Sequence, residues 1–437
     1  MAGKAVGRFE AAIGVIGILA LATTLVITTG TNPWVSIMDW LNRVTSVSSP
    51  APAWNQRMAG RPSHAGITNS AQVIVTSRGR VEGRYVSDGG VIWQHSAPWA
   101  AAAGDVVVAG LRGRGYAIFD PATGLQLWED KNAGAVWPYE DILVDLACPN
   151  SRSCLLRARS HRNNGATLWT VELPGNGRTI TGLNPDLLDT RDPAGWADAA
   201  RTGAPGPAPS VIALAIDGRV QVVDLLDGRV LREIDPGGLL TRVSVAGGRV
   251  IITKASRGES ACRYIIEAFD VQDGTSVWRH EGYDLDTASG IGCEQRRDPL
   301  GRGGLLSAVR GDNHPVLLDA ADGSERWVGL LGERVLATDG TLAVIQAADR
   351  QTARLIDLLD GNTVAWSQKL GENPEAAVTS RAVLVRDSSN DRMLVLSRNG
   401  AVLRDIKTDS ELIGFGRIGI VLASGRTVGL VTVPPSP

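Results

Sequence analysis

Residues suited to catalysis or metal binding are scarce in this sequence. No Gly-x-Ser-x-Gly nucleophile elbow and no phosphate-binding loop occur. The segment Gly110–Gly115 is rich in glycine, but it joins two expected strands rather than a strand and a helix. The five histidines do not pair at metal-ligand spacing; they are His64, His95, His161, His280 and His314. The sequence therefore predicts no catalytic residue and no metal ligand, and we do not expect an enzyme.

The chain also lacks a strong charge of either sign. Its formal net charge is −2, which gives no electrostatic basis for binding nucleic acid or anionic lipid. Lysine is rare, because arginine accounts for most of the 44 basic residues. Together with abundant alanine, glycine and valine, this bias indicates a GC-rich bacterial genome. A hydrophobic fraction of 43% is ordinary for a globular protein with a large core.

Two local clusters of charged residues can be interpreted either as solvent-exposed loops or as binding sites. Glu140, Asp141 and Asp145 contain the oxygen ligands that Ca²⁺ prefers, but solvated loop charge is the favoured interpretation. Residues 292–304 form a basic stretch that we interpret as an exposed loop. No metal ion or cofactor is predicted from either cluster.

The four cysteines fall into two local pairs. Cys148 and Cys154 bracket a short loop, while Cys262 and Cys293 flank one expected strand–turn–strand unit. An even count at close spacing favours two disulfides in an oxidising compartment. Four free, buried thiols are the alternative.

Residues 11–30 predict a transmembrane helix. The stretch carries no charge, and about 20 residues nearly span a bilayer core of roughly 30 Å. Lys4 and Arg8 precede it, so the positive-inside rule places residues 1–10 in the cytoplasm and the remainder outside. The expected location is the plasma membrane, with a single pass.

An uncleaved signal anchor is favoured over a cleaved signal peptide. The hydrophobic stretch is longer than a usual signal-peptide core, and no small-x-small cleavage site follows it closely. No cysteine lies near it, which excludes a lipid anchor. Residues 31–66 are expected to be a juxtamembrane segment followed by a linker.

From about residue 70 one pattern recurs: an apolar strand, a tight turn ending in glycine, and a short strand with tryptophan. The clearest copies are residues 116–128, 265–278 and 315–327. The spacing between turn glycines is 35 to 49 residues, apart from one step of 63. A period in the low forties is typical of a four-stranded propeller blade. The aligned turn glycines are Gly89, Gly124, Gly165, Gly228, Gly274, Gly323, Gly361 and Gly400.

The residue types of the repeat suit a β-hairpin between neighbouring blades. Glycine supplies the positive φ of the turn, and a preceding Asp or Asn tolerates the left-handed conformation. A tryptophan on the outer strand can place its large ring between blades. Five tryptophans occupy the aligned position and a sixth is one residue late; they are Trp93, Trp128, Trp169, Trp278, Trp327 and, displaced, Trp366.

This pattern resembles the PQQ-like, or quinoprotein, β-propeller repeat with its tryptophan-docking motif. The signatures of WD40 and kelch repeats are absent. The resemblance implies an all-β propeller over residues 67–433, with eight blades, or alternatively seven, of four antiparallel strands. Residues 175–209 are expected to be a loop insertion and residues 434–437 a tail. The last strands, at 411–433, are expected to share a blade with sequence near 60–95.

Quinoprotein dehydrogenases use an adjacent pair of cysteines at the cofactor, and this sequence has none, nor a Cys-x-x-Cys-His haem site. The resemblance therefore favours the non-enzymatic branch, which includes a scaffold lipoprotein of outer-membrane assembly. We expect an extracytoplasmic protein-interaction scaffold or sensor with an envelope or secretion protein as partner. A small-ligand receptor and a PQQ-dependent dehydrogenase are the alternatives. An apolar patch on one outer face would favour the scaffold.

Overall fold

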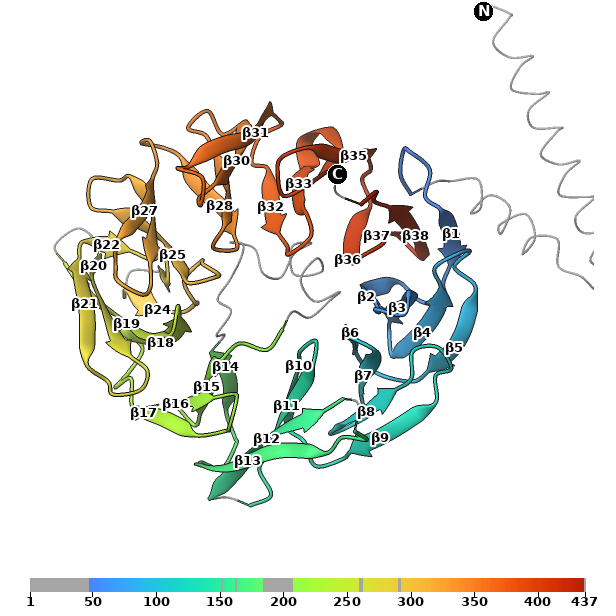
Figure 1. The fold of residues 1–437 in the computed structure, drawn as a ribbon, viewed down its shortest axis with the longest axis horizontal. Helices are drawn as coiled ribbons and strands as arrows, with labels where there is room; N and C mark the ends of the chain where they lie inside the picture. Colours follow the sequence, from blue (N-terminus) through green and yellow to red (C-terminus); the bar gives the residue numbers. More distant parts are fainter. Residues whose placement is uncertain are drawn as a thin grey trace, which may run out of the picture.

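The computed structural model describes residues 47–150, 152–161, 163–183, 207–258, 262–289 and 292–435. Within these ranges the chain forms nine four-stranded antiparallel sheets arranged in a ring, which are the blades of a β-propeller (Figure 1). The predicted transmembrane helix at 11–30 lies outside the described residues. Among the residues that are described, no helix is long and apolar enough to span a bilayer. The predicted all-β propeller is confirmed, but the predicted number of eight blades is wrong.

Each blade is numbered from the first complete sheet, and its strands run from the centre of the ring outward. Blade 1 is β2–β5 (Pro62–Ile67, Gln72–Ser77, Arg80–Tyr85, Val91–His95), and blade 2 is β6–β9 (Ala100–Ala103, Val106–Gly110, Tyr116–Phe119, Gln126–Asp130). Blade 3 is β10–β13 (Ala135–Pro138, Ile142–Ala147, Ser153–Ser160, Thr167–Pro174), and blade 4 is β14–β17 (Ile180–Leu183, Val211–Ile216, Arg219–Asp224, Val230–Ile234).

The second half of the ring follows the same order, with one insertion. Blade 5 is β18–β21 (Thr241–Ala246, Arg249–Arg257, Cys262–Asp270, Ser276–Glu281). Blade 6 is β22, β25, β26 and β27 (Tyr283–Asp284, Leu305–Arg310, Pro315–Asp319, Glu325–Val328), interrupted by the small hairpin β23–β24 (Ala288–Ser289, Glu294–Gln295). Blade 7 is β28–β31 (Arg334–Thr338, Leu342–Gln346, Thr352–Asp357, Thr363–Lys369), and blade 8 is β32–β35 (Glu375–Val378, Val383–Asp387, Arg392–Leu396, Val402–Lys407), with a short 3₁₀ turn η1 (Ser388–Asn390).

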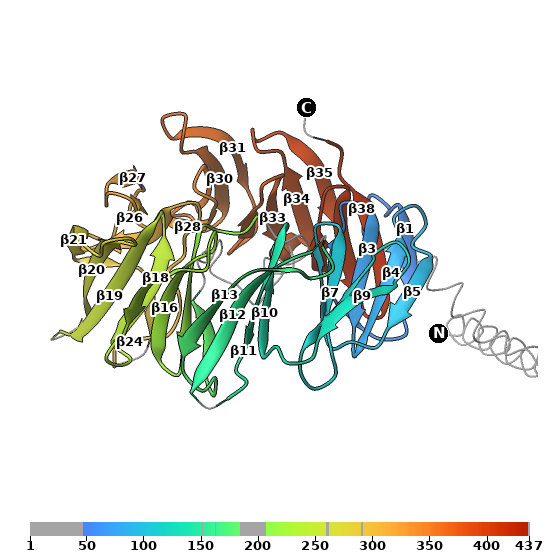
Figure 2. The ribbon, with the colours of Figure 1, turned by 60° about the horizontal axis from the view of Figure 1, so that its bottom comes forward.

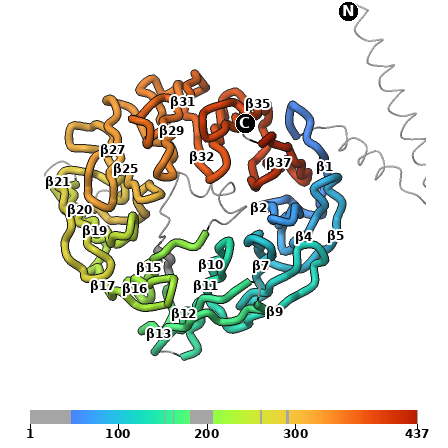
Figure 3. Tube along the Cα trace, in the orientation of Figure 1, coloured from blue at the N-terminus to red at the C-terminus, as the bar shows by residue number. Residues whose placement is uncertain are grey.

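Blade 9 closes the ring by joining the two ends of the chain. It contains β36–β38 (Glu411–Phe415, Gly419–Ser424, Thr427–Thr432) and takes its outer strand from β1 (Trp54–Arg57), with Trp54 opposite Leu430. Figure 3 shows the blue trace of β1 beside the red trace of the last strands at this point. The predicted sharing of a blade is correct in kind, but residues 60–95 form blade 1 instead.

This closure explains the wrong blade count. The eight glycine turns each connect a third strand to the fourth strand that follows it directly in the sequence. Blade 9 has no such turn, because its fourth strand comes from the other end of the chain. The expected linker at 31–66 is therefore wrong in part, since β1 and most of β2 fall within it. The expected loop at 175–209 is likewise wrong for β14, while residues 184–206 lie outside the described residues.

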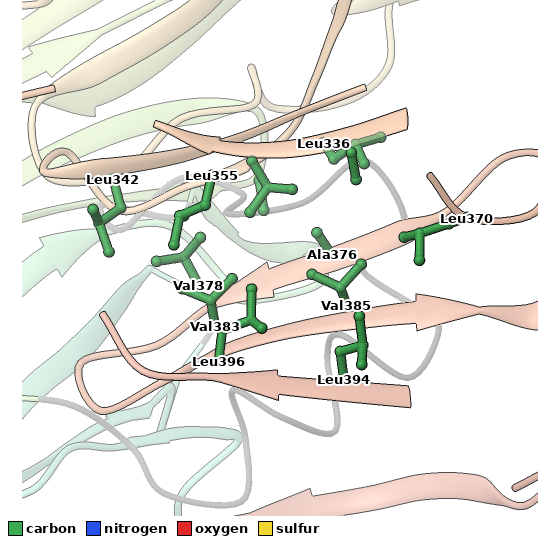
Figure 4. Close-up of a cluster of buried hydrophobic side chains, with 13 residues drawn as sticks. Leu336, Leu342, Leu355, Leu370, Ala376, Val378, Val383, Val385, Leu394 and Leu396 are labelled. Carbon is green, nitrogen blue, oxygen red and sulfur yellow. The ribbon is translucent and has the colours of Figure 1, made fainter. Parts of the chain in front are cut away.

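Neighbouring blades pack face to face through short aliphatic side chains. Between blades 7 and 8, Leu336 and Leu355 meet Val378, Val385 and the leucines of β34, and each of these side chains is buried (Figure 4). Alternation along each strand places every second side chain on a blade face, which gives this packing. Full burial of one such side chain contributes roughly 1.5–3 kcal/mol.

Because neighbouring strands of each blade are antiparallel, the connections between strands lie on two opposite faces of the disc. Figure 2 shows the disc tilted, so that the strands are seen from the side. The glycine turns and the turns between first and second strands lie on one face, here called the turn face. The connections from one blade to the next lie on the opposite face, together with the turns between second and third strands. We call this the crossover face.

Candidate functional site

The tryptophans of the repeat lie against the turn glycine of the following blade. Trp93 covers Gly124, Trp128 covers Gly165, and Trp169 and Trp278 cover Gly228 and Gly323 in the same way. A Cβ atom on any of these four glycines would lie within 3.0 Å of an indole ring. All eight turn glycines also have a positive φ, between +59° and +87°. Glycine is thus required at the docked turns both for its backbone angle and for space.

Hydrogen bonds fix the docked rings of Trp93 and Trp278. The indole Nε1 of Trp93 donates to the carbonyl oxygen of Pro121 at 2.8 Å, and that of Trp278 donates to Ala320 at 2.8 Å. Two residues after these tryptophans, His95 Nε2 contacts the carbonyl oxygen of Gly124 at 2.7 Å, and His280 Nε2 contacts that of Gly323 at 2.8 Å. These two histidines therefore serve the contact between blades.

Sequence reasoning missed one member of this series. Trp54, on the closing strand β1, covers Gly89 of blade 1, and its Nε1 donates to the carbonyl oxygen of Val86 at 2.7 Å. Its place in the expected linker hid it. The signal that could have revealed it is the number of residues that separates Trp54 from Gly89 in the sequence, which is similar to the number that separates Trp93 from Gly124.

Three turns lack a docked tryptophan. Gly274 faces Arg232 and Gly400 faces Ala365, which hold the aligned position in their blades. The displaced Trp366 instead packs against the cluster between blades 7 and 8. No side chain lies within 4 Å of a Cβ placed on Gly361, and the preceding Trp327 is buried in a separate apolar cluster.

Both predicted disulfides are present. Cys148–Cys154 closes the turn between the second and third strands of blade 3. Cys262–Cys293 ties the start of β20 to the insertion that interrupts blade 6. The insertion, residues 285–304, contains the expected basic loop, and its charges are largely paired: Arg297 with Asp286 at 2.6 Å, and Asp298 with Arg242 of blade 5 at 2.7 Å.

The three acidic residues considered for Ca²⁺ separate in the structure. Glu140 and Asp141 lie in a turn on the turn face, beside a cavity of about 50 Å³ that Asn69 and His161 also line. Asp145 is fully buried in β11 and binds two arginines. In the part of the chain that the structure describes, no three His, Cys, Asp or Glu side chains are placed to hold a metal ion.

Asp145 is the centre of an ionic network between blades 2 and 3. Its carboxylate accepts from Arg157 Nε at 2.7 Å, Arg159 Nε at 2.8 Å and the hydroxyl of Tyr116 at 2.8 Å. The Nη2 atoms of both arginines also donate to Asp130 of blade 2. Burial and the Asp145 carboxylate raise the pKa of Tyr116 far above its usual value. Although burial opposes ionisation, the Asn132 N–H and the two guanidinium groups lower the pKa of Asp130.

Exposed leucines occupy two connections on the crossover face. Leu239 and Leu240 precede blade 5, and Leu330 and Leu331 precede blade 7, with exposed fractions from 44% to 68%. We call these four residues the leucine pairs. The tethered insertion reaches the first of these connections, because Gln295 N donates to the carbonyl oxygen of Leu239 at 2.7 Å.

A family model described as outer membrane protein assembly factor BamB matches residues 262–413, from β20 into β36. This segment contains four of the glycine turns described above. This match supports a PQQ-like β-propeller family for that part of the chain. The predicted resemblance is thus confirmed, and the docked tryptophans form contacts between neighbouring blades of the propeller.

Several solved structures are similar to this propeller at low identity. The computationally designed Ika8 protein is 15% identical with a TM-score of 0.43, covering 87% of this chain and 99% of the designed chain. BamB from Moraxella catarrhalis is 16% identical with a TM-score of 0.37, covering 87% and 98%. Sqt1 from Saccharomyces cerevisiae is 8% identical with a TM-score of 0.44, covering 90% and 100%. No curated protein matches the chain.

Proposed function

We propose that this protein is a non-enzymatic interaction scaffold, held on the outer side of the plasma membrane by residues 11–30. The observation that carries the proposal is the pair of exposed leucine connections on the crossover face. Adjacent exposed leucines of this kind are candidate contact points for a protein partner. Burying an exposed leucine contributes roughly 1.5–3 kcal/mol, so four leucines supply a substantial apolar contribution to binding.

Two further features support an extracytoplasmic location. The disulfides Cys148–Cys154 and Cys262–Cys293 are typical of an oxidising compartment. Lys4 and Arg8 precede the apolar stretch, which favours a cytoplasmic N-terminus. The similarity of residues 262–413 to the BamB family model supports an envelope or secretion protein as the partner.

Proximity labelling in the native host tests the proposal. A labelling enzyme is fused to the C-terminus of the full chain, and the same fusion carries Leu330→Asp and Leu331→Asp in a second strain. The matched control is Leu226→Asp with Leu359→Asp, because these leucines are also exposed but lie on the turn face. We expect a few envelope proteins to be enriched with the unmodified and control fusions. Their enrichment should fall at least fivefold with the Leu330 and Leu331 variant.

Two outcomes would contradict the proposal. Labelling confined to cytoplasmic proteins would place the propeller on the wrong side of the membrane. Unchanged enrichment with the Leu330 and Leu331 variant would show that these two leucines do not belong to the binding surface.

A further inference from the structure

A cavity of about 510 Å³ opens on the turn face between blades 8 and 9. The residues that matter for its chemistry are three arginines and three apolar side chains: Arg381, Arg398, Arg417, Leu403, Phe415 and Val433. Ligand pockets typically measure roughly 300–1,000 Å³, so the cavity is large enough for a small ligand or the end of a peptide.

The cavity lies where the repeat is interrupted by ring closure. In blades 1 to 8, a glycine turn joins the third strand to the fourth, and the neighbouring blade contributes a side chain at the aligned tryptophan position. In blade 9, β38 ends at Thr432, and no turn leads from it to β1. Blade 8 carries Arg404 at the aligned position, and its Nε donates to the carbonyl oxygen of Thr432 at 3.0 Å. Neither the turn nor an indole ring fills this space.

The rim of the cavity is cationic. Arg398 is fixed by Asp339 of blade 7 at 2.6 Å and by the carbonyl oxygen of Thr379. Arg381 and Arg417 are exposed, and no carboxylate among the described residues pairs with either of them. None of the described residues that line the cavity is acidic. Two guanidinium groups are thus available for an anion.

The floor of the cavity is apolar. Phe415 is buried, while Leu403 and Val433 are half-buried and pack on the same hydrophobic cluster as Phe415. A ligand that suits both parts has an anionic group directly beside an apolar group. The last residue of a polypeptide meets this condition when its side chain is apolar, because the carboxylate and the side chain share one carbon atom. An internal Asp or Glu side chain has no such apolar group.

We infer that this cavity binds the C-terminal end of a partner polypeptide whose last residue is apolar. Arg381 and Arg417 bind the terminal carboxylate through charge-assisted hydrogen bonds, a geometry for which guanidinium groups are suited. The last side chain lies on Leu403, Phe415 and Val433. This inference rests on the proposed scaffold function and names how one partner is recognised.

Fluorescence anisotropy with the full-length protein in dodecyl maltoside tests the inference. The probe is a fluorescein-labelled hexapeptide, Ser-Gly-Ser-Gly-Val-Leu, with a free C-terminal carboxylate, and its amidated form is the comparison. We expect the acid to bind at least tenfold more tightly than the amide. The double variant Arg381→Gln with Arg417→Gln should weaken binding of the acid at least tenfold and abolish the difference between the two peptides.

The matched control is Arg78→Gln, an exposed arginine on the crossover face, which should bind like the unmodified protein. Equal affinity for acid and amide in the unmodified protein would overturn the inference without any variant. Displacement of the peptide by decanoate at a lower concentration than by unlabelled peptide would also overturn it, in favour of a fatty acid. These results are independent of partner enrichment in the host, so failure of the cavity assignment is distinguishable from failure of the scaffold proposal.

Discussion

Gly124 lies directly beneath the indole ring of Trp93, with a backbone φ of +71° and no room for a Cβ atom. Substitution Gly124→Ala should therefore destabilise the propeller through two effects. The left-handed backbone costs an alanine roughly 1–2 kcal/mol, and the clash with the ring adds roughly 1–3 kcal/mol. Urea unfolding should show a lower free energy of unfolding by about 2–5 kcal/mol.

Gly79→Ala is the matched control for that variant. Gly79 has nearly the same φ, +70°, but nothing lies within 4 Å of a Cβ placed there. Only the backbone cost should appear. An equal loss of stability for Gly79→Ala and Gly124→Ala would show that the indole contact is unimportant.

Trp54→Ala should loosen the closure of the ring. The substitution removes a buried ring and its hydrogen bond to Val86, and such truncations cost roughly 3–5 kcal/mol. Because β1 covers the edge of β38, amide hydrogen exchange in Thr427–Thr432 should accelerate, while exchange in β19 of blade 5 should change far less. Uniform acceleration in both strands would indicate global destabilisation rather than opening at blade 9.

The tyrosine in the ionic network predicts a loss of stability at high pH. The folded-state pKa of Tyr116 is raised above the ordinary value of about 10, so its contribution is present below pH 10. It is lost as the pH rises above 10, because the unfolded chain then releases the phenolic proton while the folded chain retains it. Tyr116→Phe removes this contribution, and its stability should fall less between pH 10 and pH 11 than that of the unmodified protein. Tyr85→Phe, at an exposed position, should match the unmodified protein in thermal unfolding across this range.

The two disulfides should differ in their contribution to stability. Cys262–Cys293 spans 31 residues and Cys148–Cys154 spans six. The chain-entropy relation gives about 4 kcal/mol for the longer loop and about 2 kcal/mol for the shorter. Paired substitutions to alanine, compared by guanidinium unfolding, should show this order, and a larger effect for the shorter loop would refute the entropic account.

The sequence carried enough information for the fold class because its signal is local. An Asp or Asn precedes seven of the eight turn glycines and a tryptophan follows five of them after four residues, all within single hairpins, so periodicity reveals them directly. Blade 9 could not be predicted from such local patterns, because it depends on the pairing of Trp54 with Leu430, which lie far apart in the sequence. Insertions hid two other inner strands: β14 is separated from β15 by residues 184–210, and β22 is separated from β25 by the tethered hairpin.

The candidate sites were less predictable because they depend on which side chains stay exposed after neighbouring blades pack together. Leu330 and Leu331 have no sequence feature that distinguishes them from the buried leucines of the strands. Arg381 and Arg417 lie in turns of blades 8 and 9 and Val433 follows the last strand, so only the packing of these two blades brings the three residues to one cavity. Asp145, by contrast, seemed to belong with Glu140 and Asp141, but strand alternation buries it against Arg157 and Arg159.

Blade 9 contains strands from both ends of the ring, and this determines when the ring can close during synthesis. A ribosome releases β1 before blades 1 to 8 and β38 after them, so the outer strand of blade 9 has no sheet to join while the intervening blades emerge. A chain terminated before β36 would keep Trp54 and the edge of blade 1 exposed to proteases and chaperones. Only a chain that includes β38 conceals both, and the pairing of β1 with β38 thereby reports that translation has passed the last strand of the ring.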